Sequence, residues 1–408
     1  MGKRSPQSLG RYLLDRRIGA GGMGEVWVAR CEGMDGPVVI KRLHRSLTDD
    51  RASVDRFFDE LVNTQRLAHE NIVRVFDGGR IGDTWFLAME FIDGLHLREC
   101  LRANGGPLQP ALAASLVRQA AVGLAFAHAA VDADLNPMNL VHRDISPDNL
   151  MVDKTGTVKV LDFGIARSKL SLTTTRISVR QGKLRYMAPE YLDGGKATPG
   201  SDVYALGMTL FELCTGMLPF EGTVDPVALV EALSTLGLPP ADEVRPDVPA
   251  QLSAIISSAT EIDPVLRTPS MNELVGRLDH FLKRHPAPDR AALCRLVAFW
   301  QERHADPKSE KGSLGQLELT AAAPASWEAK DLAREPTTSP HVQVAHPLDL
   351  TLAVSLADAI AGQTAETTAP VTAPVTPALG EHTVIVSPEL KGVSQVRARK
   401  KRRKPRQK

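Results

Sequence analysis

Three polar side chains suited to catalysis or metal binding lie close together between residues 141 and 164. They are Asp144, Asn149 and Asp162, and a short apolar hairpin over residues 150–161 separates the last two. Carboxylate and amide oxygens of this kind can hold a divalent metal ion while one carboxylate meets a substrate hydroxyl. The alternative is a structural hairpin whose polar residues only cap its turns. The joint occurrence of His-Arg-Asp, the asparagine and Asp-Phe-Gly at this spacing favours the chemical interpretation.

A glycine-rich stretch near the N-terminus has a pattern that can close over phosphate groups. Gly19, Gly21 and Gly24 precede Val26, and glycine backbone allows amide groups to approach a bound phosphate closely. A dinucleotide-binding turn requires a helix directly after the glycines, whereas residues 25–29 have the pattern of a strand. We therefore predict that the glycines form a turn between two strands. Whether that turn binds phosphate or is an ordinary glycine turn remains open, with the two alternatives equal.

The elements that position these residues change in kind near residue 93. Before it, five segments have strand patterns and predict a small antiparallel sheet: they begin at Tyr12 and continue over 25–29, 37–41, 71–76 and 84–90. A helix is predicted from about residue 50 to 68, and it carries Glu60 where it can pair with Lys41 of the sheet. After residue 93 the patterns are mainly helical, notably over 108–130. This switch predicts a boundary between two lobes.

Composition limits the class of protein. The chain has 408 residues, of which 43% are hydrophobic and 24% charged, with a formal net charge of +1. The net charge is therefore too small to attract nucleic acid to the protein as a whole. The four cysteines have no Cys-x-x-Cys spacing, which argues against a zinc site and a disulfide framework. Since there is no run of about eighteen apolar residues, we expect a soluble, cytoplasmic protein without a transmembrane segment.

The C-terminal part differs in composition from the rest. Residues 288–304 predict an accessory amphipathic helix that docks on the larger lobe, and residues 306–408 are rich in Ala, Pro, Thr and Ser. Such a low-complexity region is typical of a disordered tail. It ends in a basic run over 397–408 that is either a solvated segment or a binding site for an anionic partner: an acidic protein, a lipid surface or nucleic acid.

The motifs together resemble those of the eukaryotic-type protein kinases, most of all the soluble bacterial Ser/Thr protein kinases. The matching pieces are Gly19 to Val26, Val-Val-Ile-Lys ending at Lys41, the His-Arg-Asp motif over 142–149, Asp-Phe-Gly over 162–164, Ala-Pro-Glu over 188–190, and the segments 201–207 and 263–267. The resemblance covers about residues 8–284. It implies an α+β, two-lobed fold with an N-lobe over about 8–90, a hinge over about 90–94 and a mainly helical C-lobe over about 95–284.

The resemblance also implies ATP as substrate and Mg²⁺, with Mn²⁺ as an alternative, as cofactor. Lys41 is expected on the α- and β-phosphates, held by Glu60, while Asp162 and Asn149 bind metal and Asp144 meets the substrate hydroxyl. Arg143 is expected to meet an activation-segment phosphate, and Glu190 to form a buried ion pair with Arg267. The residues expected around the nucleotide are Ile18, Gly19, Gly21, Gly24, Val26, Val39, Met89, Glu90, Ile92 and Met151.

Two positions depart from the family pattern. The residue two after the catalytic aspartate is Ser146 where the family has lysine, and the segment before Ala-Pro-Glu has Lys183 where the family has threonine. Because those two family side chains lie close together, we predict that the cation and the hydroxyl have been exchanged between the positions. Two independent substitutions that weaken catalysis are the alternative.

The expected activity is transfer of the ATP γ-phosphoryl group to Ser or Thr hydroxyls of proteins. Autophosphorylation is expected at Thr173, Thr174 or Thr175 in the activation segment. The main alternative is a pseudokinase or scaffold that binds nucleotide and partners without efficient catalysis, and its one supporting feature is Ser146. A small-molecule phosphotransferase of the same architecture would not need the peptide-docking segment 182–190.

Overall fold

The structure is a computed structural model that describes residues 7–20, 24–44, 47, 54, 64–132, 134–163, 182–223 and 225–305. Three groups of predictions lie outside these residues. They are Gly21 and Glu60, the activation-segment threonines 173–175, and the tail over 306–408 with its basic run. Most of the helix predicted over about 50–68 also lies outside.

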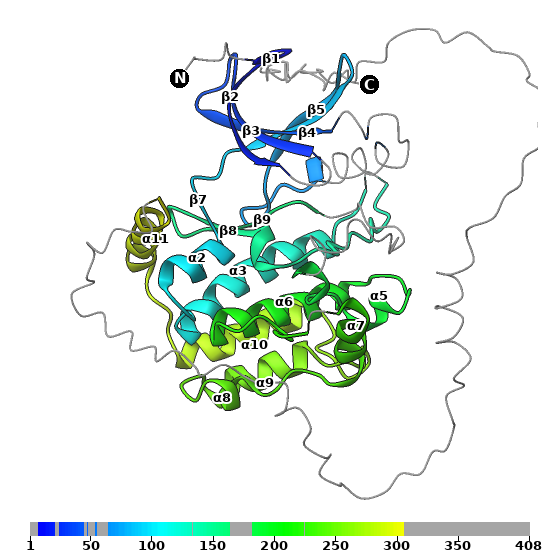
Figure 1. Ribbon diagram of the computed structural model, residues 1–408, viewed down its shortest axis with the longest axis vertical. Helices are drawn as coiled ribbons and strands as arrows, with labels where there is room; N and C mark the ends of the chain where they lie inside the picture. Colours follow the sequence, from blue (N-terminus) through cyan, green and yellow to red (C-terminus); the bar gives the residue numbers. More distant parts are fainter. Residues whose placement is uncertain are drawn as a thin grey trace, which may run out of the picture. The chain divides into compact units, whose positions relative to one another are not determined.

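The smaller lobe is built on one antiparallel sheet (Figure 1). Its strands are β1 (Gln7–Leu9), β2 (Tyr12–Ala20), β3 (Gly24–Cys31), β4 (Pro37–Leu43), β5 (Val75–Ile81) and β6 (Thr84–Glu90), in the spatial order β1-β2-β3-β4-β6-β5. Strands β2 and β3, which flank the predicted glycine turn, pair antiparallel, and residues 21–23 of the turn itself lie outside the described residues. The prediction of five strands was wrong by one, because the short strand β1 pairs with the start of β2 and extends the edge.

The predicted strand over 71–76 was also misplaced, since β5 begins only at Val75. The preceding residues use their backbone groups differently: the Val73 amide donates to the Val160 carbonyl, and the Val160 amide donates to the Asn71 carbonyl, each at 2.9 Å. This apolar segment therefore joins the smaller lobe to β9 instead of extending the sheet. Periodicity cannot distinguish those two uses of the same residues.

The larger lobe is mainly helical and carries a second sheet at its top. The sheet has the order β7 (Gly94–His96), β8 (Leu150–Asp153) and β9 (Val158–Val160). The helices are α2 (Leu97–Asn104), α3 (Pro110–His128), the 3-10 turn η2 (Pro147–Asn149), α5 (Pro189–Leu192), α6 (Pro199–Thr215), α7 (Pro226–Thr235), α8 (Ala241–Val244), α9 (Ala250–Ala259), α10 (Met271–Arg284) and α11 (Arg290–Ala305). The predicted two-lobed α+β fold is confirmed.

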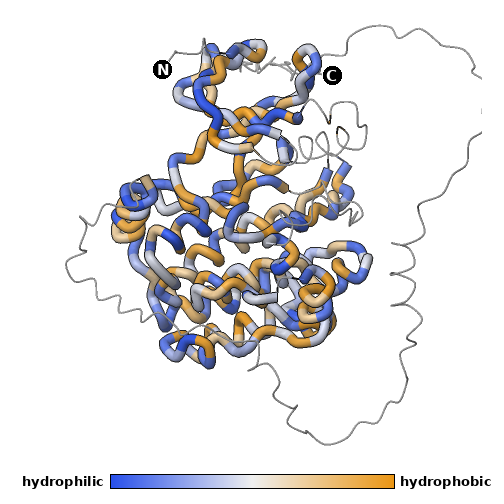
Figure 2. The backbone as a smooth tube through the Cα atoms, in the orientation of Figure 1, coloured by the Kyte–Doolittle hydropathy of each residue, from blue (hydrophilic) through white to orange (hydrophobic). Residues whose placement is uncertain are grey.

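Two apolar helices form the centre of the larger lobe. Most residues of α3 are buried, and every residue of α6 from Ser201 to Thr215 is buried. In Figure 2 hydrophobic residues recur along these helices. Within the described part of the chain, α3 alone is long and apolar enough to cross a membrane, but 67% of its apolar window is buried inside the protein. It therefore has the character of a core helix.

The last described helix, α11, corresponds to the accessory helix predicted over 288–304. Leu293, Val297 and Trp300 are buried against the larger lobe, and the Trp300 indole donates to Asn104 of α2 at 3.3 Å. Gln301 donates to Asp93 in the connection before β7, at 3.2 Å. Helix α11 therefore covers the side of the larger lobe next to the hinge.

Candidate active site

One buried carboxylate, that of Asp202, holds the backbone of residues 142–149, which are called the catalytic loop below. Asp202, at the start of α6, accepts the backbone amide of His142 at 2.7 Å and that of Arg143 at 2.9 Å. His128 of α3 lies 2.8 Å from the same carboxylate. Arg143 has a φ of 67°, a left-handed conformation that is costly for a non-glycine residue and needs such support. The sequence contained Asp202 within a family motif, but sequence reasoning gave it no role.

His142 connects this loop to the Asp-Phe-Gly segment. Its Nε2 lies 2.7 Å from the Leu161 carbonyl oxygen, and its ring lies 4.9 Å from the ring of Phe163. Burial lowers the pKa of His142, although Asp202 acts in the opposite direction. The imidazole is therefore neutral at physiological pH and has a structural role.

Asp144 shares one of its oxygens with two donors. Its Oδ2 accepts the Lys183 ammonium at 2.6 Å and the Asn149 amide nitrogen at 3.0 Å. The same Asn149 nitrogen donates to the Asp144 backbone carbonyl at 2.5 Å. The 3-10 turn η2, which begins at Pro147, brings Asn149 back toward Asp144. The structure thus brings together Asp144, Asn149 and Lys183. The exchange predicted between Lys183 and Ser146 stays a prediction.

Lys41 and Asp162 bring the two lobes together at this site. The Lys41 ammonium on β4 lies 3.0 Å from Asp162 Oδ1, and the Lys41 side chain is only 15% exposed. Burial acts to raise the pKa of Asp162, but Lys41 first, and then Lys183 and His142, hold that pKa below its usual value. Asp162 is therefore ionised at neutral pH, and its φ of 45° is a second strained conformation.

The donor set at Asn149 and Asp162 fits a magnesium ion. The side-chain nitrogen of Asn149 is hydrogen-bonded to Asp144, which leaves its amide oxygen as a possible metal ligand. Asp162 contributes an ionised carboxylate. Mg²⁺ prefers oxygen ligands and is usually held by one or two carboxylates together with substrate phosphates. The described residues contain no cluster of three or more His, Cys, Asp or Glu that would make a closed protein site.

Four of the ten residues expected around the nucleotide meet in one apolar cluster. Val39 and Met89 are buried in it, with Val26 and Ile92 packed against it. Strand register explains part of this grouping, since Val39 on β4 lies opposite Met89 on β6. Leu161 also packs there, and sequence reasoning missed it although it is an apolar residue directly before Asp162. 

Other residues expected at the nucleotide site lie around this cluster. Met151 is partly buried on β8, and Ile18 at 45% is exposed on β2. Glu90, at the end of β6, accepts the Lys159 ammonium at 2.8 Å. A Cβ atom at Gly19 would make only an ordinary contact with Val26, at 3.7 Å, so packing does not require glycine at this position.

Gly24 has a structural reason to be glycine. A Cβ atom at this position would lie 1.9 Å from the Arg42 carbonyl oxygen of the neighbouring strand β4. Close approach of two backbones therefore requires glycine here whether or not a phosphate binds. From the sequence, a phosphate-binding turn and an ordinary glycine turn were the two explanations, and neither included this close approach of strands.

Glu190 and Arg267 form the predicted buried ion pair. The two Arg267 terminal nitrogens lie 2.8 and 2.9 Å from the two Glu190 oxygens, and the Arg267 side chain is 1% exposed. Burial acts to raise the pKa of Glu190, but Arg267 holds that pKa below its usual value. Ser201 donates a further hydrogen bond to Glu190 at 3.0 Å. The pair thereby fixes α5 to the loop before α10.

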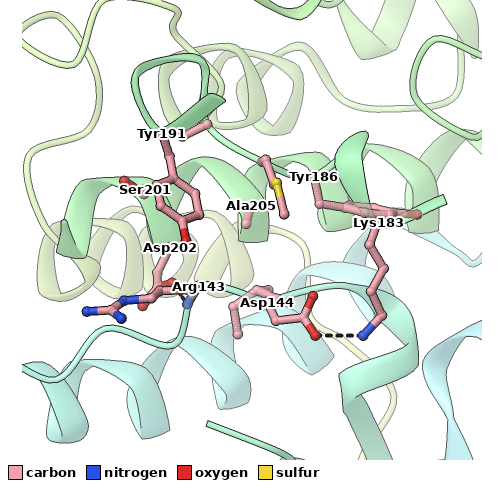
Figure 3. A pocket seen from close by; sticks show the side chains of 11 residues that line it. Arg143, Asp144, Lys183, Tyr186, Tyr191, Ser201, Asp202 and Ala205 are labelled. Carbon is pink, nitrogen blue, oxygen red and sulfur yellow. Dashed lines mark hydrogen bonds and ion pairs between the residues drawn. The ribbon is translucent and has the colours of Figure 1, made fainter. Parts of the chain in front are cut away.

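A pocket opens beside Asp144, between the catalytic loop and the segment 182–190. Asp144, Lys183, Tyr186, Tyr191 and Ser201 are among the residues that line it. Figure 3 shows the Lys183 and Asp144 side chains pointing toward each other at one end of this pocket.

Comparison with known proteins identifies the family. Residues 12–277 match the protein kinase domain. The tyrosine-protein kinase MasK of Myxococcus xanthus is 36% identical over 344 residues, which are 82% of this chain and 52% of MasK. The serine/threonine-protein kinase PrkC of Bacillus subtilis is 38% identical over 63% of this chain and 38% of PrkC. The chain thus spans about half of MasK and less of PrkC.

A third relative and a solved structure match more of their own length. The serine/threonine-protein kinase PknL of Mycobacterium tuberculosis is 31% identical over 80% of this chain and 78% of PknL. The crystal structure of the Mycobacterium tuberculosis PknI kinase domain matches with a TM-score of 0.52 and 26% identity, covering 69% of this chain and 99% of that domain. With its kinase-domain match, the two-lobed fold and the assembled motifs, the chain belongs to the protein kinase family.

Proposed function

We propose that this protein is a Ser/Thr protein kinase, which transfers the γ-phosphoryl group of ATP to Ser or Thr hydroxyls of proteins. The observation that carries the proposal is the assembly of Lys41, Asp144, Asn149 and Asp162 at the junction of the two lobes. A pseudokinase or scaffold would be favoured by loss of one of these residues, and all four are present. The strained backbone of Asp162, and of Arg143 next to Asp144, also fits a site that is maintained for chemistry.

Each side chain has a task in the transfer. Lys41 binds the α- and β-phosphates, and Asp144 orients the acceptor hydroxyl. The acceptor oxygen bonds to the γ-phosphorus while the bond from that phosphorus to the β-phosphate oxygen breaks. The electron pair of the broken bond leaves with ADP, and the hydroxyl proton passes to Asp144. Asn149 and Asp162 would hold Mg²⁺, which when bound neutralises charge on the phosphate oxygens.

The choice of Ser/Thr over Tyr rests on sequence features and on relatives. PrkC and PknL are named serine/threonine-protein kinases, and the sequence keeps Pro147 and the Tyr-Met-Ala-Pro-Glu form of the segment before α5. MasK is named a tyrosine-protein kinase, so tyrosine is the second candidate acceptor. Phosphoamino-acid analysis separates the two.

Activation by phosphorylation within Thr173 to Thr175 is part of the proposal. The supporting observation is at Arg143, whose Nε is buried without a hydrogen-bond partner among the described residues. A guanidinium with an unsatisfied donor is suited to a phosphate.

The basic run over 397–408 is proposed to hold an anionic partner through charge alone. A cytoplasmic location is proposed for the whole protein.

The test is an activity assay on the purified full chain with γ-labelled ATP and Mg²⁺. Lys41→Met and Asp144→Asn serve as controls, and each is expected to lower the rate at least about a hundredfold. Label on Ser or Thr of the wild type that is absent from both variants supports the proposal. Label on tyrosine alone would favour the second acceptor, and no label with retained nucleotide binding would favour the pseudokinase.

A further inference from the structure

The roles proposed above for the other site residues leave Lys183 without a function. Its ammonium lies 2.6 Å from Asp144 Oδ2, the carboxylate proposed to meet the acceptor hydroxyl. Lys183 is therefore next to the carboxylate proposed to meet the acceptor, where the phosphoryl group of a bound nucleotide would be transferred.

The segment that carries Lys183 is anchored on the residues that follow. The buried guanidinium of Arg185 donates to the Pro219 and Thr223 carbonyls, each at 2.8 Å, and also to the Phe220 carbonyl. The Tyr186 hydroxyl donates to Glu212 of α6, which is itself buried. Because these contacts fix the backbone next to Lys183, they also hold the Lys183 side chain close to Asp144. A lysine on a free surface would lose this contact to rotamer entropy.

Ser146 provides an independent observation two residues from Asp144. The residue is 1% exposed, and its Oγ has no hydrogen-bond partner among the described residues. A buried hydroxyl left unsatisfied is costly, and such groups in proteins call for an explanation. A ligand that brings an acceptor or donor to the catalytic loop would satisfy it.

We propose that Lys183 is a catalytic residue that supplies positive charge to the transferred phosphoryl group, and that the Ser146 hydroxyl completes the same site. The inference deepens the kinase activity proposed above and rests on it. Phosphoryl transfer is accelerated mainly by positioning and by charge stabilisation, so one cation placed at the γ-phosphate has a large effect on rate. The two residues thereby exchange the cation and hydroxyl that the family keeps at the opposite positions.

The first test is Lys183→Ala in the full chain, with Lys196→Ala as the matched control because Lys196 is an exposed lysine of the same lobe. Lys183→Ala is expected to lower kcat by about 10²–10³-fold, with the affinity for a fluorescent ATP analogue and the melting temperature unchanged. Lys196→Ala is expected to match the wild type. A kcat within about threefold of the wild type would overturn the proposal. A higher kcat would also overturn it, because Lys183 would then be blocking Asp144.

The second test is the reciprocal exchange. Lys183→Thr and Ser146→Lys are each expected to be slow, and the double variant is expected to recover at least about tenfold in kcat over the slower single variant. No recovery in a folded double variant would overturn the exchange. If Ser146→Lys does not fold, Ser146→Ala decides: it is expected to lower kcat about tenfold, and an unchanged kcat would remove Ser146 from the site.

These tests separate the role of Lys183 from the proposed activity. Wild-type turnover and phosphoamino-acid analysis decide whether the protein is a kinase. The ratio of variant to wild-type kcat decides whether Lys183 acts on the transferred group. A purely structural role would instead appear as a lower melting temperature with equal losses in nucleotide binding.

Discussion

Two ion pairs lie at opposite ends of the segment 182–190, and they differ in the burial and the hydrogen bonding of their cations. Glu190 and Arg267 form a two-point contact at 2.8 and 2.9 Å, and Arg267 donates further to three backbone carbonyls. Lys183 and Asp144 form a one-point contact at 2.6 Å, with 33% and 17% of their side chains exposed. In the first pair the Arg267 guanidinium is 1% exposed and all its donors are hydrogen-bonded, while Glu190 is 22% exposed. The second pair faces a pocket.

The difference shows which pair stabilises the fold and which is available for chemistry. A buried pair with all its donors satisfied cannot rearrange without leaving a buried charge unpaired. A lysine with one partially exposed contact can move to a new anionic group at little cost. The four predictions that follow test this distinction, in order of decreasing effect on stability.

The largest effect is expected from Arg267→Ala. This change leaves the Glu190 carboxylate without its guanidinium partner, and the free energy of unfolding should fall by about 3–5 kcal/mol. Urea denaturation followed by tryptophan fluorescence measures it. A loss below about 1 kcal/mol would mean that the buried pair is no more structural than an exposed one.

The second prediction concerns the pH dependence of the same pair. Because the pKa of Glu190 is lowered in the folded protein, its contribution to stability is present above the ordinary pKa of 4.5 and is lost as the pH falls through the folded value. The stability difference between the wild type and Glu190→Gln should therefore shrink on acidification below about pH 4.5. Denaturation at a series of pH values measures it, and a constant difference would contradict the assignment.

A third, intermediate effect is expected from Asp202→Asn. The amide can accept only at one oxygen, so one of the His142 and Arg143 backbone amides loses its partner, at a cost of about 1–3 kcal/mol. Activity should fall with it because the catalytic loop is displaced. Asp279→Asn is the control, since its pair with Arg118 is partly exposed and should contribute less than about 1 kcal/mol.

The smallest effect on stability is expected from Lys183→Ala. An ion pair with this exposure contributes less than about 1 kcal/mol to the free energy of unfolding. Differential scanning fluorimetry against wild type should show almost no shift, although kcat falls by orders of magnitude. A stability loss as large as that of Arg267→Ala would erase the distinction between the two pairs.

The order and spacing of motifs were sufficient to predict most of the fold. Lys41, Asp144, Asn149 and Asp162 were selected because the chemistry of phosphoryl transfer restricts both the residue types and their spacing, and their roles stay predictions. The hairpin of β8 and β9 and the helix α3 were predicted for a second reason. Both are apolar over a local stretch of sequence, and their lengths suit a strand pair and a buried helix.

Tertiary packing decided what local patterns could not. The start of β5, the extra strand β1 and the role of Gly24 depend on which backbone lies alongside, and periodicity does not specify that partner. The role of Asp202 appeared only when α6 was seen to pack beneath the catalytic loop, whose amides are about sixty residues away in sequence.

The sequence by itself determined that a cation and a hydroxyl stand at unusual positions, Lys183 and Ser146. The tertiary structure decided that the cation reaches the Asp144 carboxylate, across 39 residues of sequence. The physical reason is that an ammonium is placed by the elements that hold its backbone, here through Arg185 and Tyr186, and those contacts involve distant parts of the chain.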